Sequence, residues 1–178
     1  MTRDSFSTCR QSTNRLFKAI LFTFVALLMA SNAAANPEGG TVASGSATIV
    51  KESPKKLTVK QQSNRTVINW RNFSIGEGEQ THFQQPHGGA ALNRVTSSQV
   101  SRILGKLTAT GKVFLVNPNG VVFGKNARVD VSALVSSIHD VRNRDFMAGR
   151  LRFTIPGHAD AKITNQGTIS VKEGGLVA

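Results

Sequence analysis

Side chains capable of acid–base or metal chemistry are few in this chain and lie far apart. Past residue 35 there are four aspartates and five glutamates, and none of them cluster. Calcium-dependent lyase chemistry needs several carboxylates around the ion and a Lys or Arg as base, and the sequence offers no such group. The histidines form no i, i+4 pair and have no cysteine partner, which disfavours a metal site. The residues considered are Asp130, Asp140, Asp145, Asp160, His82, His87, His139 and His158.

The G-x-S-x-G motif of a serine nucleophile is also missing from the sequence. We therefore predict that the chain is not an enzyme and that it has no catalytic, metal-binding or cofactor-binding residues.

Residues 117–120 read Asn-Pro-Asn-Gly, and their chemistry is that of hydrogen bonding in a tight turn. Pro118 fixes φ near the value required at the second position of a β-turn, and Asn117 can hydrogen-bond to its own backbone. Asn119 and Gly120 adopt positive φ at little cost. The four residues therefore predict a sharp corner in the chain.

Short apolar segments flank this corner and predict β-strands. Residues 113–116 and 121–123 are β-branched and aromatic, and residues 128–133 alternate with the period of two of a half-buried strand. A similar corner with asparagine and glycine returns later in the sequence, where Gly167 lies 47 positions after Gly120. That spacing corresponds to two coils of about 23 residues in a parallel β-helix. An antiparallel sandwich with Asn-Gly hairpins is the alternative that these residues leave open.

The remaining elements are expected to be short strands joined by polar or glycine-rich corners. The exception is residues 97–107, where apolar side chains recur at spacings of three and four and predict a short capping helix. Residues 138–148 mix charged and apolar side chains, so we expect them to leave the coil as an excursion. The predicted strands cover residues 48–50, 57–60, 66–70, 90–95 and 151–155.

The amino terminus has the organisation of a secretory signal peptide. Four basic residues precede an apolar segment of 12 residues, which is shorter than the roughly 20 residues of a membrane-spanning helix. Cleavage is expected between Ala35 and Asn36, with cleavage after Ala33 as the alternative. The expected domains are a signal peptide at residues 1–35 and a mature domain at residues 36–178. The mature domain contains no cysteine, because Cys9 is the only one.

The chain is strongly basic, with 22 Lys and Arg against 10 Asp and Glu. Without the first 35 residues the counts are 18 and 9, which leaves a net charge of +9. Such a surface could be merely solvated, or could meet nucleic acid, anionic lipopolysaccharide or an acidic protein. Nucleic-acid bases stack on aromatic side chains, and the chain has one tryptophan, no tyrosine and ten phenylalanines, most of them in apolar contexts. We therefore expect no nucleic-acid partner.

A series of motifs in this chain resembles one known family. The motifs are residues 66–70 (T-V-I-N-W), 73–76 (F-S-I-G), 91–95 (A-L-N-R-V), 103–105 (I-L-G) and 113–124, which contains N-P-N-G-V. In this order, across residues 36–178, they resemble the amino-terminal secretion domain of two-partner-secretion exoproteins. This is the filamentous haemagglutinin family, which includes adhesins, haemolysins and contact-dependent growth inhibition toxins. A further N-P-N-L turn of the haemagglutinin branch is missing, so the subgroup stays open.

The resemblance implies an all-β fold, a right-handed parallel β-helix with an amino-terminal cap and short non-helical excursions. We expect about six coils, which together bury faces that one coil could not bury alone. The pattern stops without a polar cap, which we interpret as the front part of a longer exoprotein or a truncated copy. The predicted core comprises Val113, Leu115, Val121, Phe123, Val129, Val131, Leu134, Ile163, Ile169 and Val171.

The resemblance also implies a function in secretion. The Sec machinery would export the chain to the periplasm of a Gram-negative bacterium, where POTRA domains of an outer-membrane β-barrel transporter would recognise it. The chain would cross unfolded and fold at the cell surface or in the medium. A stand-alone surface adhesin of the haemagglutination type, which binds a host glycan or host protein, is the alternative.

Two sets of residues are candidates for recognition by the transporter. Asn117, Pro118, Asn119 and Gly120 are either a secretion motif or a purely structural corner, and the two roles can coincide. The second set lies in an alternating segment that could add a strand to a sheet edge of the transporter. Its members are Ile68, Trp70 and Phe73.

Overall fold

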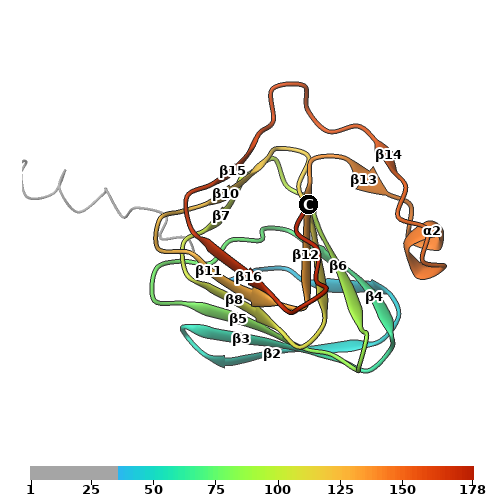
Figure 1. The fold of residues 1–178 in the computed structure, drawn as a ribbon, viewed down its shortest axis with the longest axis horizontal. Helices are drawn as coiled ribbons and strands as arrows, with labels where there is room; N and C mark the ends of the chain where they lie inside the picture. Colours follow the sequence, from blue (N-terminus) through green and yellow to red (C-terminus); the bar gives the residue numbers. More distant parts are fainter. Residues whose placement is uncertain (1–35) are drawn as a thin grey trace, which may run out of the picture. The chain divides into compact units, whose positions relative to one another are not determined.

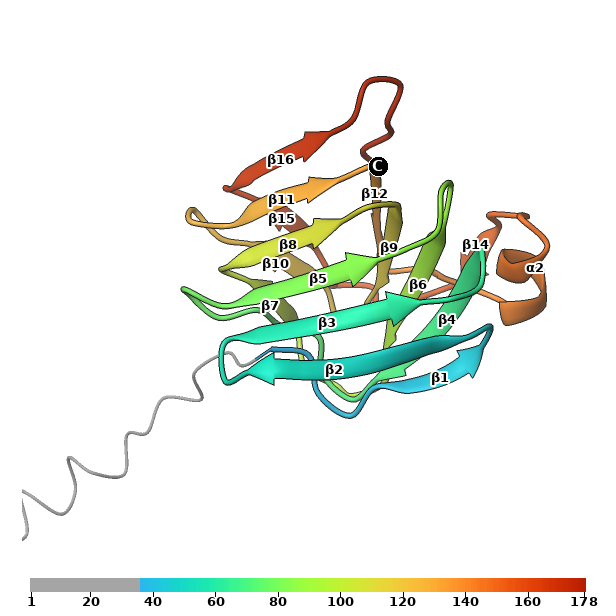
Figure 2. The same ribbon diagram turned by 90° about the horizontal axis from the view of Figure 1, so that it is seen from below.

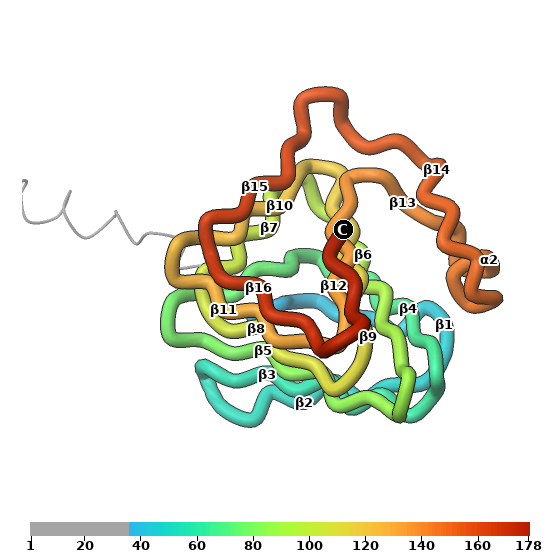
Figure 3. Tube along the Cα trace, viewed as in Figure 1, coloured from blue at the N-terminus to red at the C-terminus, as the bar shows by residue number. Residues whose placement is uncertain are grey.

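The computed structural model describes residues 36–178, so the predicted signal peptide, including Ala35, lies outside the described residues. These residues form a β-solenoid of about three complete turns. Figures 1 and 3 show the coils end on, and Figure 2 shows successive strands stacked above one another. In the part of the chain that the structure describes, no helix is both long and apolar enough to cross a membrane.

Three sheets form the sides of the solenoid. The six-stranded sheet has the order β16-β11-β8-β5-β3-β2, the five-stranded sheet β1-β4-β6-β9-β12 and the three-stranded sheet β15-β10-β7. Strands of successive coils pair in parallel, as β5 with β8 and β9 with β12. The parallel pairing confirms the predicted β-helix and rules out the antiparallel sandwich.

The strands are short, as predicted from the spacing of corners in the sequence. Those of the six-stranded sheet are β2 Ala47–Ser53, β3 Lys56–Gln61, β5 Gln80–Gln84, β8 Lys106–Ala109, β11 Arg128–Val131 and β16 Thr168–Val171. Those of the five-stranded sheet are β1 Thr41–Ser44, β4 Arg65–Trp70, β6 Ala90–Val95, β9 Lys112–Val116 and β12 Ala133–Ser137. The three-stranded sheet contains β7 Ser101–Ile103, β10 Val121–Phe123 and β15 Ile163–Asn165.

The amino-terminal end of the solenoid is capped by two antiparallel strands. β2 pairs with β3, and β1 pairs with β4, so the first strand of each large parallel stack is covered. An uncovered edge would present free backbone donors and acceptors to other chains. The predicted amino-terminal cap is therefore present, and it is built from strands.

The strand register shows that one coil takes 20–26 residues. The shortest interval separates the paired residues Ser101 and Val121, and the longest separates Gln80 and Lys106. The interpretation of Gly120 and Gly167 as two coils apart is wrong. Thr168 pairs directly with Arg128, so Gly167 belongs to the very next coil. The extra residues form the excursion that begins near residue 138. The expected number of six coils is too high for the same reason, and because residues 41–53 form the cap.

The helix predicted at residues 97–107 is also wrong, because this segment forms β7 and β8. Ser101 and Ile103 are buried while Arg102 is exposed, which is the period of a strand. Gly105 makes the corner between the two strands, where a Cβ atom would lie only 2.3 Å from the carbonyl oxygen of Gly76. The tight stacking of two coils at Gly105 therefore decides the local structure.

The interior of the solenoid is apolar. Of the predicted core, the seven residues from Val113 to Leu134 are at most 2% exposed. Ile169 and Val171 are only partly buried, and Ile163 is 42% exposed. These three residues lie on β15 and β16, which are the outermost strands of their sheets among residues 36–178. At the opposite end the rings of Trp70, Phe73 and Phe83 pack together, with centroids 5.7 and 6.4 Å apart.

A second apolar cluster lies on the outer face of the five-stranded sheet. The excursion contains β13 (Asp140–Val141), helix α2 (Asn143–Met147) and β14 (Phe153–Ile155). It places Phe146 against Phe114, with ring centroids 5.2 Å apart, and it projects beside the coils in Figure 1. The excursion was predicted at this place. It was expected to contain no helix, but it contains α2.

Candidate functional site

The Asn-Pro-Asn-Gly segment forms the corner between β9 and β10, as predicted. The amide of Gly120 donates to the carbonyl oxygen of Asn117 at 3.0 Å, and the amide of Asn119 donates to Asn117 Oδ1 at 2.9 Å. Gly120 has a φ of 108°, and a Cβ atom there would lie 2.6 Å from the carbonyl oxygen of Lys162. Glycine is therefore required both by conformation and by the proximity of the next coil.

The side chain of Asn117 is fully buried and uses all its hydrogen-bonding capacity within the fold. Its Nδ2 donates to the carbonyl oxygen of Gln99 and to Ser101 Oγ, both at 2.9 Å. Its Oδ1 accepts from the backbone and side-chain nitrogens of Asn119, at 2.9 and 3.1 Å. No group of this side chain is left for a partner of the folded domain.

The corner is held between the loops of the preceding and following coils. Asn119 Nδ2 donates to the carbonyl oxygen of Ser97 at 2.9 Å. Ser97 Oγ in turn donates to Asn72 Oδ1 at 2.7 Å. On the other side, the amide of His158 donates to the carbonyl oxygen of Pro118 at 3.0 Å. The hydrogen bonds thus join the corners of four successive coils.

Sequence reasoning missed Asn72, Ser97 and Ser101 as partners of the corner. A signal was present, since Asn72 precedes Ser97 by 25 residues and Ser97 precedes Asn119 by 22 residues. Both intervals equal one coil in the observed register. A search for polar residues repeating at this interval would have found Asn72 and Ser97, but not Ser101, which lies 16 residues before Asn117.

The second set of candidates, Ile68, Trp70 and Phe73, lies in the interior and is at most 1% exposed. Trp70 Nε1 donates to Asn93 Oδ1 at 3.0 Å, so even its polar atom is used within the fold. Ile68 and Trp70 are on β4, which lies between β1 and β6 and has no free edge, and Phe73 follows shortly after this strand. In the folded domain these residues cannot meet a partner. They lie apart from the Asn-Pro-Asn-Gly corner, and the connection between the two sets is the hydrogen bond from Ser97 to Asn72, the residue before Phe73.

Asn36, predicted to be the first residue after cleavage, is packed against the solenoid. It is 6% exposed, and its Oδ1 accepts from Thr81 Oγ1 at 3.0 Å. Two residues later, Glu38 pairs with Asn72 in an isolated antiparallel bridge. The chain is therefore tied to the first coils from the start of the described residues, whereas the cleavage site itself stays a prediction.

Few charges interact closely in the described residues. The most buried pair is Arg94 with Asp140, at 2.6 Å. His82 has a lowered pKa, because its partial burial disfavours the charged ring and Lys56 repels it. Hydrogen bonds from Lys56 and Arg150 lower the pKa values of Glu52 and Asp145 respectively. Within residues 36–178, no three His, Cys, Asp or Glu side chains form a group that could hold a metal ion.

Comparisons with known proteins agree with the geometry. Residues 33–178 match the model of the family described as the TPS secretion domain. The chain is 40% identical, over 111 residues, to a heme/hemopexin-binding protein of Haemophilus influenzae. That match covers 62% of this chain and 12% of the relative. The same protein in the KW20 Rd strain is 41% identical over 106 residues.

A solved structure is also similar. It is the crystal structure of the HMW1 secretion domain from Haemophilus influenzae, with a TM-score of 0.69 and 34% sequence identity. The match covers 76% of this chain and 37% of the solved chain.

Proposed function

This chain belongs to the TPS secretion domain family, and we propose that an outer-membrane transporter recognises it before it folds. The Sec machinery would export the chain to the periplasm, and the leader would be cleaved between Ala35 and Asn36. POTRA domains of the transporter would then bind the unfolded chain. Folding would follow outside the outer membrane, at the cell surface or in the medium.

The observation that supports recognition before folding is the burial of Asn117 in the first candidate set and of all three residues in the second. Asn117 has no free hydrogen-bonding group in the folded domain, and Ile68, Trp70 and Phe73 lie in the core. β4 is covered by β1 and β6. A partner that reads these residues by adding a strand to its sheet must therefore meet an extended chain.

Export tests the proposed function. The chain would be expressed in a Gram-negative host with and without a related barrel transporter, and its amount in the medium would be measured. We expect release only in the presence of the transporter. Release without it, or retention as a folded periplasmic protein, would contradict the proposal and favour the surface adhesin.

A binding measurement separates recognition from folding. The Ile68→Asp/Trp70→Asp variant and the matched Val59→Asp/Phe83→Asp variant each place two charges at positions that are at most 1% exposed. Both variants should fail to fold, because buried unpaired charges are very costly. If residues 65–75 are read in the unfolded state, only the first variant loses affinity for isolated POTRA domains. Equal affinities of the two unfolded variants would show that this segment is not the one recognised.

A stand-alone surface adhesin remains the second candidate function. The relatives are named for binding heme and hemopexin, and the basic surface suits an acidic host glycan or protein. The chain spans only 12% of those relatives, so their binding activity does not transfer to it directly. The export experiment distinguishes the two candidates.

A further inference from the structure

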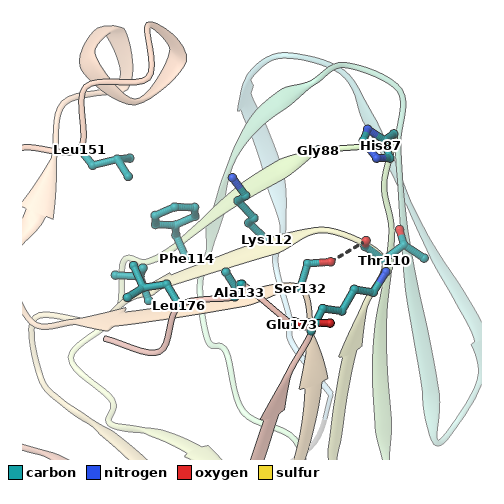
Figure 4. Close-up of a pocket in the computed structure, with 14 residues that line it drawn as sticks. His87, Gly88, Thr110, Lys112, Phe114, Ser132, Ala133, Leu151, Glu173 and Leu176 are labelled. Carbon is teal, nitrogen blue, oxygen red and sulfur yellow. Dashed lines mark hydrogen bonds between the residues drawn. The ribbon is translucent and has the colours of Figure 1, made fainter.

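A groove of about 400 Å³ lies on the outer face of the five-stranded sheet, beside its last strand β12. Phe114 and Ala133 form its floor. Leu151, from the excursion, and Leu176, from the last coil, form its walls and point toward one another across it (Figure 4). The groove is separate from the Asn-Pro-Asn-Gly corner and from the interior of the solenoid.

The register explains why the outer face is hollow here. Ala90, Lys112 and Ala133 lie opposite one another in successive coils, so two of the three positions carry only a methyl group. The neighbouring position in β9 is Phe114, which the excursion covers from one side through Phe146 and Phe153. Leu151 lies at the edge of the excursion's cover over the sheet. Beyond it, the apolar side chains between the excursion and the last coil line the groove.

The walls are exposed apolar side chains. Leu151 is 45% exposed and Leu176 is 55% exposed, which makes them two of the five large exposed hydrophobic residues of the described chain. Burial of such surface against an apolar ligand is favourable. The volume falls within the range of about 300–1,000 Å³ that is typical of small-molecule sites.

The rim of the groove carries two ammonium groups. Lys112 and Lys172 line it, together with His87 and one acid, Glu173. Both lysines are exposed, and neither forms an ion pair with another described residue. A lysine ammonium is a compact charge suited to a phosphate or carboxylate head group.

We propose that this groove binds the acyl chain of an anionic lipid, with Lys112 and Lys172 beside its charged head group. A peptide is a poorer fit, because β12 offers it no free backbone. The amide of Leu134 already donates to Leu176, and the carbonyl oxygen of Leu134 accepts from Ala178. The acyl chain of a lipid needs no hydrogen bonds from the groove, whereas a peptide added as a strand would need free backbone groups on β12.

Calorimetric titration of the purified chain tests the proposal with three probes. Dodecyl phosphate, used below its critical micelle concentration, combines the acyl chain with the charged head. Inorganic phosphate supplies the head group alone, and dodecyl maltoside supplies the chain with an uncharged head. We expect one dodecyl phosphate to bind per chain, at least about tenfold more tightly than either of the other probes. Absence of dodecyl phosphate binding, or equal binding of any two probes, would overturn the proposal.

Variants locate the binding to the groove. Leu151→Asp should weaken dodecyl phosphate binding about tenfold by removing one apolar wall, and Lys112→Glu/Lys172→Glu should do so by reversing the charge of the rim. The matched controls are Ile155→Asp and Lys162→Glu, which alter exposed residues outside the groove and should leave binding unchanged.

Circular dichroism of each variant shows whether it folds. If folded Leu151→Asp and folded Ile155→Asp lose the same amount of dodecyl phosphate affinity, the probe binds anywhere on the excursion. That result would overturn the assignment of binding to the groove. If Leu151→Asp does not fold, the charge-reversal pair decides the question in the same way. The titration uses purified protein and does not involve the transporter, so its outcome is independent of the proposed secretion function.

Discussion

At the scale of single residues, Asn117 carries more of the fold than any other polar side chain of the corner. It is fully buried and makes two donated and two accepted hydrogen bonds. These bonds fix the loop of the preceding coil as well as the turn itself. Under the proposed function, a secretion partner would read Asn117 in the unfolded chain, and the same side chain closes the corner in the folded domain.

Asn117→Ala should therefore destabilise the folded domain. The carbonyl oxygen of Gln99 and the buried Ser101 Oγ lose a donor, and a buried polar group without its partner costs about 1–3 kcal/mol. Urea denaturation measures the loss. Asn126→Ala is the matched control, because Asn126 is exposed and makes one 3.4 Å bond to Glu77. Its effect should stay within about 0.5 kcal/mol, and equal losses in the two variants would contradict the role given to Asn117.

His82 makes stability depend on pH. Its Nδ1 lies 2.8 Å from Thr108 Oγ1 on the outer face of the six-stranded sheet, near Lys56 and Glu52. Burial and the charge of Lys56 lower its pKa below the ordinary 6.5, so the unfolded chain takes up the proton first. The free energy of unfolding should therefore fall as the pH decreases below about 6.5 toward the lowered pKa.

The measurement is urea denaturation at about pH 7.5 and about pH 5.5, on either side of the ordinary histidine range. His82→Gln keeps a polar partner for Thr108 but removes the titrating ring, so this part of the pH dependence should disappear. Glu52 does not titrate between these two pH values, because the hydrogen bond from Lys56 lowers its pKa below the ordinary 4.5. An unchanged pH profile in His82→Gln would show that other groups are responsible.

At the scale of elements, an apolar cluster and the guanidinium of Arg94 attach the excursion to the solenoid. Arg94 on β6 pairs with Asp140, and it also donates to Asn69 Oδ1, Asn143 Oδ1 and the carbonyl oxygen of Val141. Arg94 and Asp140 are 15% and 16% exposed, so solvent screens their pair only partly. The guanidinium therefore joins β13 and the start of α2 to the sheet.

Arg94→Gln should loosen the excursion before it affects the coils. Hydrogen bonds to charged groups contribute roughly 1.5–3 kcal/mol, so hydrogen exchange of residues 138–155 should accelerate while the interior strands stay protected. Arg71→Gln is the control, because the Arg71–Glu38 pair is 67% and 49% exposed and such pairs contribute about 0–1 kcal/mol. Uniform acceleration of all amides in Arg94→Gln would show that the excursion is part of one cooperative unit.

Elements were predictable where the signal is local, and not where it comes from the next coil. The turn predicted at residues 117–120 is confirmed, and the strand predicted at residues 128–133 is confirmed over residues 128–131, after which Ser132 makes a corner into β12. At residues 97–107 the apolar spacing fitted a helix, but contact of Gly105 with the preceding coil selects two strands. The groove was not predictable, because the register that aligns Ala90 with Ala133 cannot be read from either strand alone.

At the scale of the whole molecule, stability depends on how many coils cover a given residue. Interior faces are buried between neighbouring coils, and repeat proteins gain stability from each such interface. At one end the antiparallel β1 and β2 complete the cover. At the other, β15 and β16 each have a neighbour on one side only. The same apolar residue should therefore contribute less in the last coil than in an inner one.

Two isoleucines of the three-stranded sheet test this dependence on position. Ile103 on β7 is fully buried, and Ile163 on β15 is 42% exposed. Ile103→Ala should cost about 2–5 kcal/mol, as expected for a buried isoleucine. Ile163→Ala should cost less than about 1 kcal/mol, because much of its surface is already in water. Urea denaturation of both variants measures the difference. Equal costs would mean that the last coil is covered in solution, by a second copy of the chain or by another ligand, and a concentration series of the wild-type chain would identify the first case.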